Sequence, residues 1–132
     1  MVTSWARRAL PIVAWLFVAC AIVQVFLAGL GVFENPARFV THREFGYLFG
    51  WLAIVMLMLA LVGRMGRRVL GLTVLLIVLF TLQSVFVLFR TSQPMIAALH
   101  PVNGFLIILV GIVLAREGRR VGWPPPADPP PG

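Results

Sequence analysis

Four long apolar runs dominate the chain and limit its fold more than any other feature. They occupy about residues 9–31, 42–62, 69–89 and 95–115. Each is long enough to cross a hydrocarbon core of about 30 Å, because a helix rises about 1.5 Å per residue. We therefore expect an all-α fold, an integral membrane four-helix bundle in which the runs are the spans.

Little of the chain is left over for a second domain. It has 132 residues, is 61% hydrophobic and contains only four acidic residues, which excludes an ordinary soluble domain. We expect residues 1–118 to form one bundle. Residues 119–132, which end in "GWPPPADPPPG", are expected to form a Pro-rich, disordered cytoplasmic tail.

The basic residues are all arginines and are unevenly distributed about the spans. One side of the membrane is predicted to hold Arg7, Arg8, Arg64, Arg67, Arg68, Arg116, Arg119 and Arg120. The other side holds Arg38, Arg43 and Arg90. The positive-inside tendency then places both termini in the cytoplasm of a bacterium, with the protein in its cytoplasmic (inner) membrane. Because the arginines flank spans and form no continuous patch, we expect contact with membrane lipids and no nucleic acid.

The two halves of the chain carry the same residues at matching spacings. The first half contains Gln24, Pro36, His42 and Gly46, and the second contains Gln83, Pro94, His100 and Gly104. Proline precedes histidine by six residues in both halves, and glycine follows histidine by four in both. This pattern predicts two pseudo-repeated helical hairpins. The two histidines would then lie at similar depth near the outer side, on the second and fourth spans.

Histidine at this depth needs a polar partner. An imidazole in an apolar span must be hydrogen-bonded or bound to a metal. Gly46 and Gly104 lie on the same helix faces as the histidines and would let a flat macrocycle approach the backbone. We therefore predict that His42 and His100 are the axial ligands of one haem b. Pro101 directly follows the second histidine and predicts a kink.

Other polar residues near the same depth have two interpretations each. Arg38, Arg43 and Arg90 are expected at the outer edge, where they would pair with haem propionates or only extend to the membrane interface. Gln24 and Gln83 would either contact the cofactor or hydrogen-bond between helices.

Three segments resemble the four-helix halves of haem A synthases. "THREFG" (41–46) is similar to the His-Arg-x-x-Gly/Ala motif of the second helix, and "QVFLAGLGVF" (24–33) to the Gln-containing end of the first. "LHPVNGFLI" (99–107) lies where the fourth-helix histidine of that family belongs. The resemblance covers nearly all of residues 10–115 and implies a bis-histidine haem b between the second and fourth helices. Small actinobacterial membrane proteins of unassigned function also resemble this chain and share the "HPVNG" element.

The chain departs from haem A synthases in two ways. Those enzymes contain two such halves, and this chain is one. Their substrate-side half also carries a glutamate three residues before the second-helix histidine, where this chain has Phe39. A homodimer would restore eight helices but not that carboxylate, so haem A synthesis is not expected.

The leading functional hypothesis is a multi-pass membrane protein like a b-type cytochrome, for electron transfer or haem handling. A quinol or another redox partner would exchange electrons with it. The alternative is a haem-free structural or assembly subunit, in which hydrogen bonds satisfy both histidines. A small dimeric transporter is disfavoured, because no acidic residue lies in the middle of a span.

Overall fold

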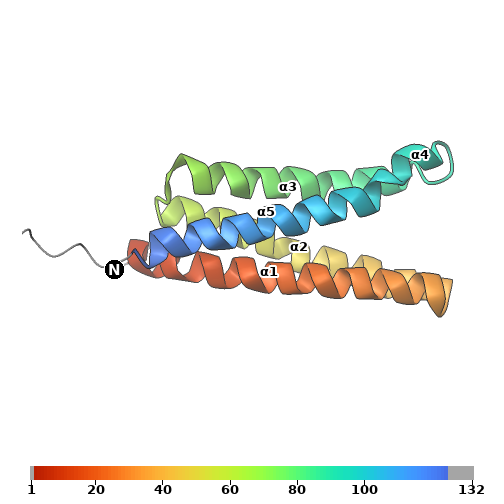
Figure 1. The fold of residues 1–132 in the computed structure, drawn as a ribbon, viewed down its shortest axis with the longest axis horizontal. Helices are drawn as coiled ribbons and strands as arrows, with labels where there is room; N and C mark the ends of the chain where they lie inside the picture. Colours follow the sequence, from red (N-terminus) through yellow and green to blue (C-terminus); the bar gives the residue numbers. More distant parts are fainter. Residues whose placement is uncertain (1, 125–132) are drawn as a thin grey trace, which may run out of the picture.

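A computed structural model describes residues 2–124, and these form a bundle of four long helices joined by short linkers (Figure 1). The long helices are α1 (Val2–Phe33), α2 (Phe39–Val62), α3 (Gly66–Leu88) and α5 (Leu99–Gly122). Two short helices, η1 (Pro36–Arg38) and α4 (Pro94–Ala97), precede α2 and α5. All four spans are long and apolar enough to cross a membrane. The predicted all-α, membrane-type four-helix bundle is confirmed.

The helices extend beyond the apolar runs. The first begins at Val2 instead of near residue 9, and the last continues through Gly122. The prediction that disorder begins at residue 119 is therefore wrong for residues 119–122. Arg119 and Arg120 form part of the last helical turn, where positive charge interacts favourably with the helix dipole. Trp123 and Pro124 follow the helix, and residues 125–132 of the predicted tail lie outside the described residues.

The helix order around the bundle puts the two histidine-bearing helices at opposite corners. α1 packs against α2 and α5, and α3 packs against the same two helices. Across the described chain, no backbone packing contact joins α2 to α5 or α1 to α3. The bundle therefore consists of two hairpins, α1–α2 and α3–α5, and the sites of His42 and His100 face each other along a diagonal.

The interior is packed most tightly at the end of the bundle where α1 begins and α5 ends. Buried side chains on α1 run from Ala6 to Ala21, and those on α3 run only from Val69 to Leu76. Toward the linkers near residues 34 and 90, most side chains are exposed or half-buried, and Figure 1 shows the ends of the two hairpins apart there. The bundle is therefore closed at one end and more open at the other.

Small residues bring α1 and α5 close together at the closed end. A methyl group added at Gly118 would lie 2.7 Å from a methyl carbon of Leu10. One added at Gly122 would lie 2.5 Å from the carbonyl oxygen of Arg7. That carbonyl has no helical partner four residues on, because Pro11 has no amide hydrogen. Such seams of small residues are typical of membrane helices that pack by close backbone approach.

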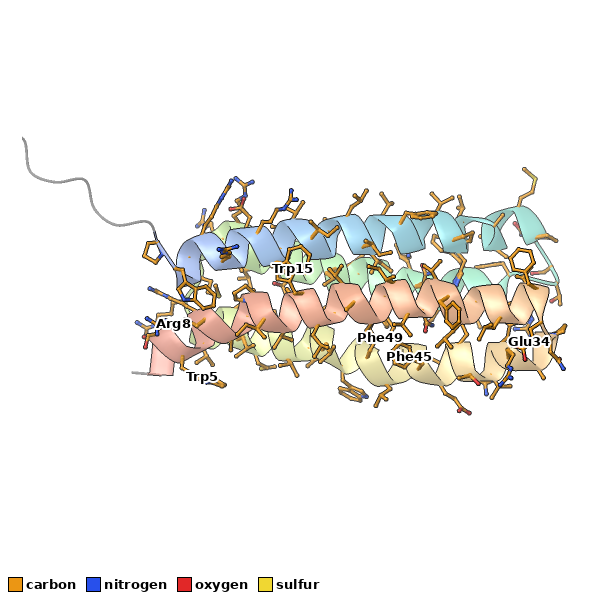
Figure 2. The ribbon with its side chains drawn as sticks, turned by 60° about the horizontal axis from the view of Figure 1, so that its bottom comes forward. Trp5, Arg8, Trp15, Glu34, Phe45 and Phe49 are labelled. Atoms are coloured by element: carbon orange, nitrogen blue, oxygen red, sulfur yellow. The ribbon has the colours of Figure 1, made fainter. Side chains whose placement is uncertain are left out.

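Polar contacts tie the ends of the helices together. Arg7 Nε donates to the carbonyl oxygen of Gly63, the residue that caps the C-terminal end of α2, at 2.7 Å. Glu117 on α5 pairs with Arg68 at the start of α3 at 3.1 Å and with Arg120 at 2.9 Å. Figure 2 shows Trp5 and Arg8 near this end and Glu34 at the other. The arginines at the closed end thus fasten helix ends as well as flanking the spans.

Candidate functional site

Local capping sets the position of His42. The side chain of Asn35 accepts a hydrogen bond from the backbone nitrogen of Ala37 at 2.9 Å, and Pro36 is the first residue of η1. This arrangement is favourable at a helix start, since proline lacks the amide hydrogen that would be unpaired there. η1 continues directly into α2, in which His42 is the fourth residue.

His100 follows an interruption in its helix. Pro94 opens α4, and α5 begins at Leu99 after a break at Ala98. Pro101 explains the break, because it lacks the amide hydrogen that would bond the carbonyl four residues earlier and its ring crowds that carbonyl. The break thus falls at Ala98, and His100 is the second residue of the helix that follows, whereas a kink at Pro101 itself stays a prediction.

The two imidazoles meet across the bundle. The ring centroids of His42 and His100 are 6.1 Å apart, and the ring planes are inclined by 60°. Both residues are half-buried. Because α2 and α5 occupy opposite corners, only side chains directed into the bundle from both helices come this close. The structure thus brings together the two histidines that the sequence singled out.

Each imidazole is hydrogen-bonded to the backbone of the other long helix of its hairpin, α1 for His42 and α3 for His100. His42 Nδ1 lies 3.1 Å from the carbonyl oxygen of Gln24, and His100 Nδ1 lies 2.9 Å from that of Gln83. A carbonyl oxygen only accepts, so each Nδ1 carries the proton and each Nε2 has the free lone pair. This tautomer leaves Nε2 of both rings able to bind a metal or to accept a hydrogen bond.

The glutamine side chains connect neighbouring helices, which is one of their two expected roles. Gln24 Nε2 donates to the carbonyl oxygen of His42 at 2.6 Å. In the other hairpin, Asn103 Nδ2 donates to Gln83 Oε1 at 2.6 Å and to the carbonyl oxygen of Leu79 at 2.8 Å. Asn103 is not among the predicted site residues, although a polar residue one turn after a histidine in an apolar span is a recognisable signal.

The two hairpins differ at one corresponding position. Asn103 lies three residues after its histidine, and the residue three after His42 is Phe45. As a result, Gln24 Oε1 is buried without a hydrogen-bond partner among the described residues, whereas Gln83 Oε1 is paired. In the α3–α5 hairpin the amide oxygen of the glutamine beside the histidine is therefore hydrogen-bonded, whereas in the α1–α2 hairpin it is not.

An aromatic cluster fills the bundle next to the site. The ring of Phe45 lies 5.5 Å from that of Phe49, and Figure 2 shows both between α1 and α2. The ring centroid of Phe49 lies 5.2 Å from that of Phe17 and 5.3 Å from that of Phe80. These rings come from three helices and close the interior on the side of the termini.

Glutamine amides occupy the space beside both predicted glycines. A Cβ atom at Gly46 would lie 2.7 Å from Gln24 Nε2, and one at Gly104 would lie 3.4 Å from Gln83 Nε2. Because glycine has no side chain, these two positions leave room for the glutamine amides of the neighbouring helices. That these glycines also admit a macrocycle stays a prediction.

The three arginines predicted near the site have different environments. Arg38 pairs with Glu34 at 2.8 Å, and both side chains are about half exposed. Arg43 and Arg90 are exposed, and their guanidinium groups make no hydrogen bond or ion pair within residues 2–124. Pairing of these arginines with propionates stays a prediction. Among the described residues, no group of three or more His, Cys, Asp or Glu residues is arranged to hold a metal ion, so the histidine pair is the candidate ligand set.

One family model matches the chain from the last part of α1 through α2 and α3, and stops before α5. Residues 24–91 match the family of unknown function DUF6220, and the matched segment includes Gln24, His42, Gly46 and Gln83 but ends before His100. No curated protein and no solved structure matches the chain. The resemblance to haem A synthases therefore rests on the three short motifs alone. Because the match spans more than half of its length, the chain belongs to the DUF6220 family.

Proposed function

We propose that this protein is a membrane b-type cytochrome-like protein that binds one haem b between α2 and α5 through Nε2 of His42 and His100. It would serve in single-electron transfer or in haem handling. The observation that carries the proposal is the pairing of two imidazoles that both donate Nδ1–H to a backbone carbonyl.

That hydrogen-bonding pattern is the usual second contact of a metal-binding histidine. Ligand imidazoles nearly always donate their other ring nitrogen to a carbonyl, carboxylate or water, which fixes the ring and raises the basicity of the ligating atom. Here the acceptors are the carbonyl oxygens of Gln24 and Gln83. Equivalent residues of the two halves therefore orient both rings with Nε2 available to a metal.

The separation of the rings supports a shared ion. A bond between a metal and an imidazole nitrogen is about 2 Å long, so two imidazoles on opposite sides of one ion have ring centroids roughly 6 Å apart. The centroids of His42 and His100 are 6.1 Å apart. The donor set, two neutral imidazoles and no anionic ligand, suits a six-coordinate haem.

The hydrogen bonds at the site do not connect one hairpin to the other. Those of His42 and Gln24 stay within α1–α2, and those of His100, Gln83 and Asn103 stay within α3–α5. The hairpins can therefore separate slightly at the open end, and admit a flat group, without breaking any of these bonds. When bound, the iron of such a haem gains and loses one electron. The protein would hold the iron on both sides and surround the ring with apolar side chains.

A haem-free structural or assembly subunit is the second candidate, and one observation favours it. The amides of Gln24 and Gln83 already fill the space beside Gly46 and Gly104, and each imidazole already has a hydrogen bond. On this hypothesis the histidine–glutamine pairs only fasten the two helices of each hairpin.

The deciding experiment is an oxidised-minus-reduced absorption spectrum of the purified protein, with a haem assay on the same sample. We expect a sharp low-spin b-type spectrum and about one haem per chain. His42→Ala and His100→Ala should each abolish the low-spin signal. The matched control is Gln93→Ala, which changes an exposed polar residue in the linker before α4 and should keep it.

Two outcomes would contradict the proposal in different ways. A colourless protein that takes up no added haem would rule out the cytochrome and leave the structural subunit. Colour that persists when both histidines are replaced would show that haem binds elsewhere.

A further inference from the structure

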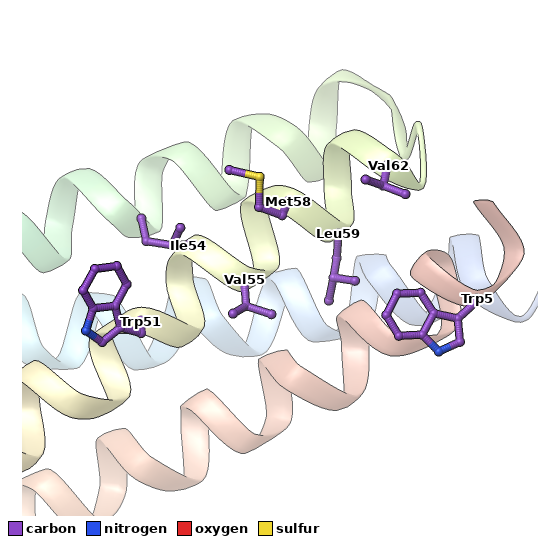
Figure 3. Close-up of a pocket in the computed structure, with 7 residues that line it drawn as sticks. All are labelled: Trp5, Trp51, Ile54, Val55, Met58, Leu59 and Val62. Atoms are coloured by element: carbon purple, nitrogen blue, oxygen red, sulfur yellow. The ribbon is translucent and has the colours of Figure 1, made fainter. Parts of the chain in front are cut away.

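An apolar groove runs along the outer surface between α1 and α2, away from the histidines (Figure 3). Its volume is about 350 Å³, and every residue that lines it is apolar. Trp51 lies at one end, and Trp5 and Val62 lie at the other, with Val55 between them on α2. Because this surface faces outward from four apolar spans, the groove opens toward the membrane interior.

The length of the groove corresponds to one leaflet. Trp51 and Val62 are eleven residues apart on α2, which is about 16 Å at the rise of an α-helix. A whole hydrocarbon core is about 30 Å thick. The groove therefore extends from near the middle of the membrane to the closed end of the bundle, as one lipid chain does.

The end of the groove lies among positive charges. The closed end of the bundle holds Arg7, Arg8, Arg64, Arg67, Arg68, Arg116, Arg119 and Arg120. Among the residues that the structure describes, Glu117 is the one acid at this end, and it is already paired with two arginines. An anionic group is thus attracted to this end, and a cationic group is repelled.

Two of these arginines are close in sequence to the last residues of the groove. Arg64 follows Val62 by two residues in the turn between α2 and α3, and Arg8 lies one helical turn from Trp5. Both are exposed, and neither guanidinium has a hydrogen bond or ion pair with another residue of the described segment. They are available to a ligand at the membrane surface.

We propose that this groove, together with Arg8 and Arg64, binds an anionic phospholipid. One acyl chain would lie along α2 between Trp51 and Val62, and the phosphate would accept hydrogen bonds from the two guanidinium groups. The exposed indole of Trp5 suits the boundary between chain and head group. The excess positive charge would disfavour a zwitterionic lipid, whose head group carries a cation. This inference does not depend on haem binding.

The test uses the full chain in bilayer discs made of equal amounts of phosphatidylglycerol and phosphatidylcholine. After extraction into detergent, native mass spectrometry counts the lipids that stay bound. We expect phosphatidylglycerol to be retained in excess. The pair Arg8→Gln and Arg64→Gln should lower its retention several-fold, whereas the pair Arg43→Gln and Arg90→Gln, with the same charge change at the other end, should not.

A second variant tests the groove itself. Val55→Trp fills it from the exposed face of α2 and should abolish retention, whereas Val78→Trp, at a similarly exposed valine on α3, should not. Equal retention of the two lipids, equal loss in both arginine pairs, or no retained lipid at all would overturn the proposal. If Val55→Trp does not fold, as judged by circular dichroism, the arginine pairs decide alone.

Discussion

Gln24 and His42 exchange two hydrogen bonds between neighbouring helices. Gln24 Nε2 donates to the carbonyl oxygen of His42 at 2.6 Å, and His42 Nδ1 lies 3.1 Å from the carbonyl oxygen of Gln24. The second hairpin keeps the histidine contact, between His100 and Gln83, but directs the glutamine side chain to Asn103 instead. Both halves of the repeat therefore keep the hydrogen bond that orients the imidazole, but the partner of the glutamine side chain differs between them.

The amide network around Asn103 should contribute measurably to stability. Asn103→Leu leaves Gln83 Oε1 without its donor, and an unpaired buried polar atom costs about 1–3 kcal/mol. We expect the free energy of unfolding in detergent to fall by about this amount. Denaturant titration followed by circular dichroism measures the change.

A double-mutant cycle isolates this interaction. Gln83→Leu combined with Asn103→Leu removes both partners, so the pair should cost less than the sum of the single substitutions. Strict additivity of the two costs would show that the 2.6 Å contact contributes nothing to folding.

Close approach of α1 and α5 should make two glycines intolerant of a methyl group. Gly118→Ala and Gly122→Ala place a carbon 2.7 Å from Leu10 and 2.5 Å from the backbone of Arg7. Each should destabilise the bundle by about 1–3 kcal/mol, because a packed seam must open. Thermal unfolding in detergent checks this.

Gly71→Ala is the matched control for these two substitutions. It lies within a helix with no atom near the added carbon, so alanine should be neutral or stabilising by up to about 1 kcal/mol. Equal changes in melting temperature for all three variants would contradict the close approach of α1 and α5 at these glycines.

The hydrogen bond from Arg7 should fasten the end of α2. Arg7→Gln removes a 2.7 Å contact between a guanidinium and the carbonyl oxygen of Gly63, and bonds to charged groups contribute about 1.5–3 kcal/mol. We expect a lower melting temperature than for Arg67→Gln, which removes the same charge from an exposed position nearby. Equal melting temperatures of the two variants would mean that only the charge matters.

Hydrophobicity and spacing were sufficient to predict the fold and the meeting of the two histidines. The spans follow from runs of apolar residues, and the repeat places His42 and His100 at matching positions. The helix ends were harder, because arginine both favours helix and reaches the membrane surface, so α5 continues through Arg119 and Arg120.

The partners of the histidines could not be predicted from residue types. Both imidazoles bond to backbone carbonyl oxygens, which every residue possesses, so no side chain identifies them. The diagonal placement of α2 and α5 also depends on how the hairpins pack, which the repeat alone does not determine. The difference between Phe45 and Asn103 is visible in the sequence, but its effect on Gln24 appears only when the helices are in contact.

The two glycines beside the histidines separate the structural role from the haem-binding role. From packing alone, Gly46→Ala should displace the amide of Gln24, 2.7 Å from the new carbon, and cost about 1–3 kcal/mol by breaking its bond to His42. Gly104→Ala meets Gln83 at 3.4 Å and should leave stability almost unchanged. If a macrocycle lies against both helices, however, both substitutions should lower the haem content, whatever they do to stability. Thermal unfolding and a haem assay on each variant decide this, since unchanged haem content in a stable Gly104→Ala protein would remove that glycine from the proposed site.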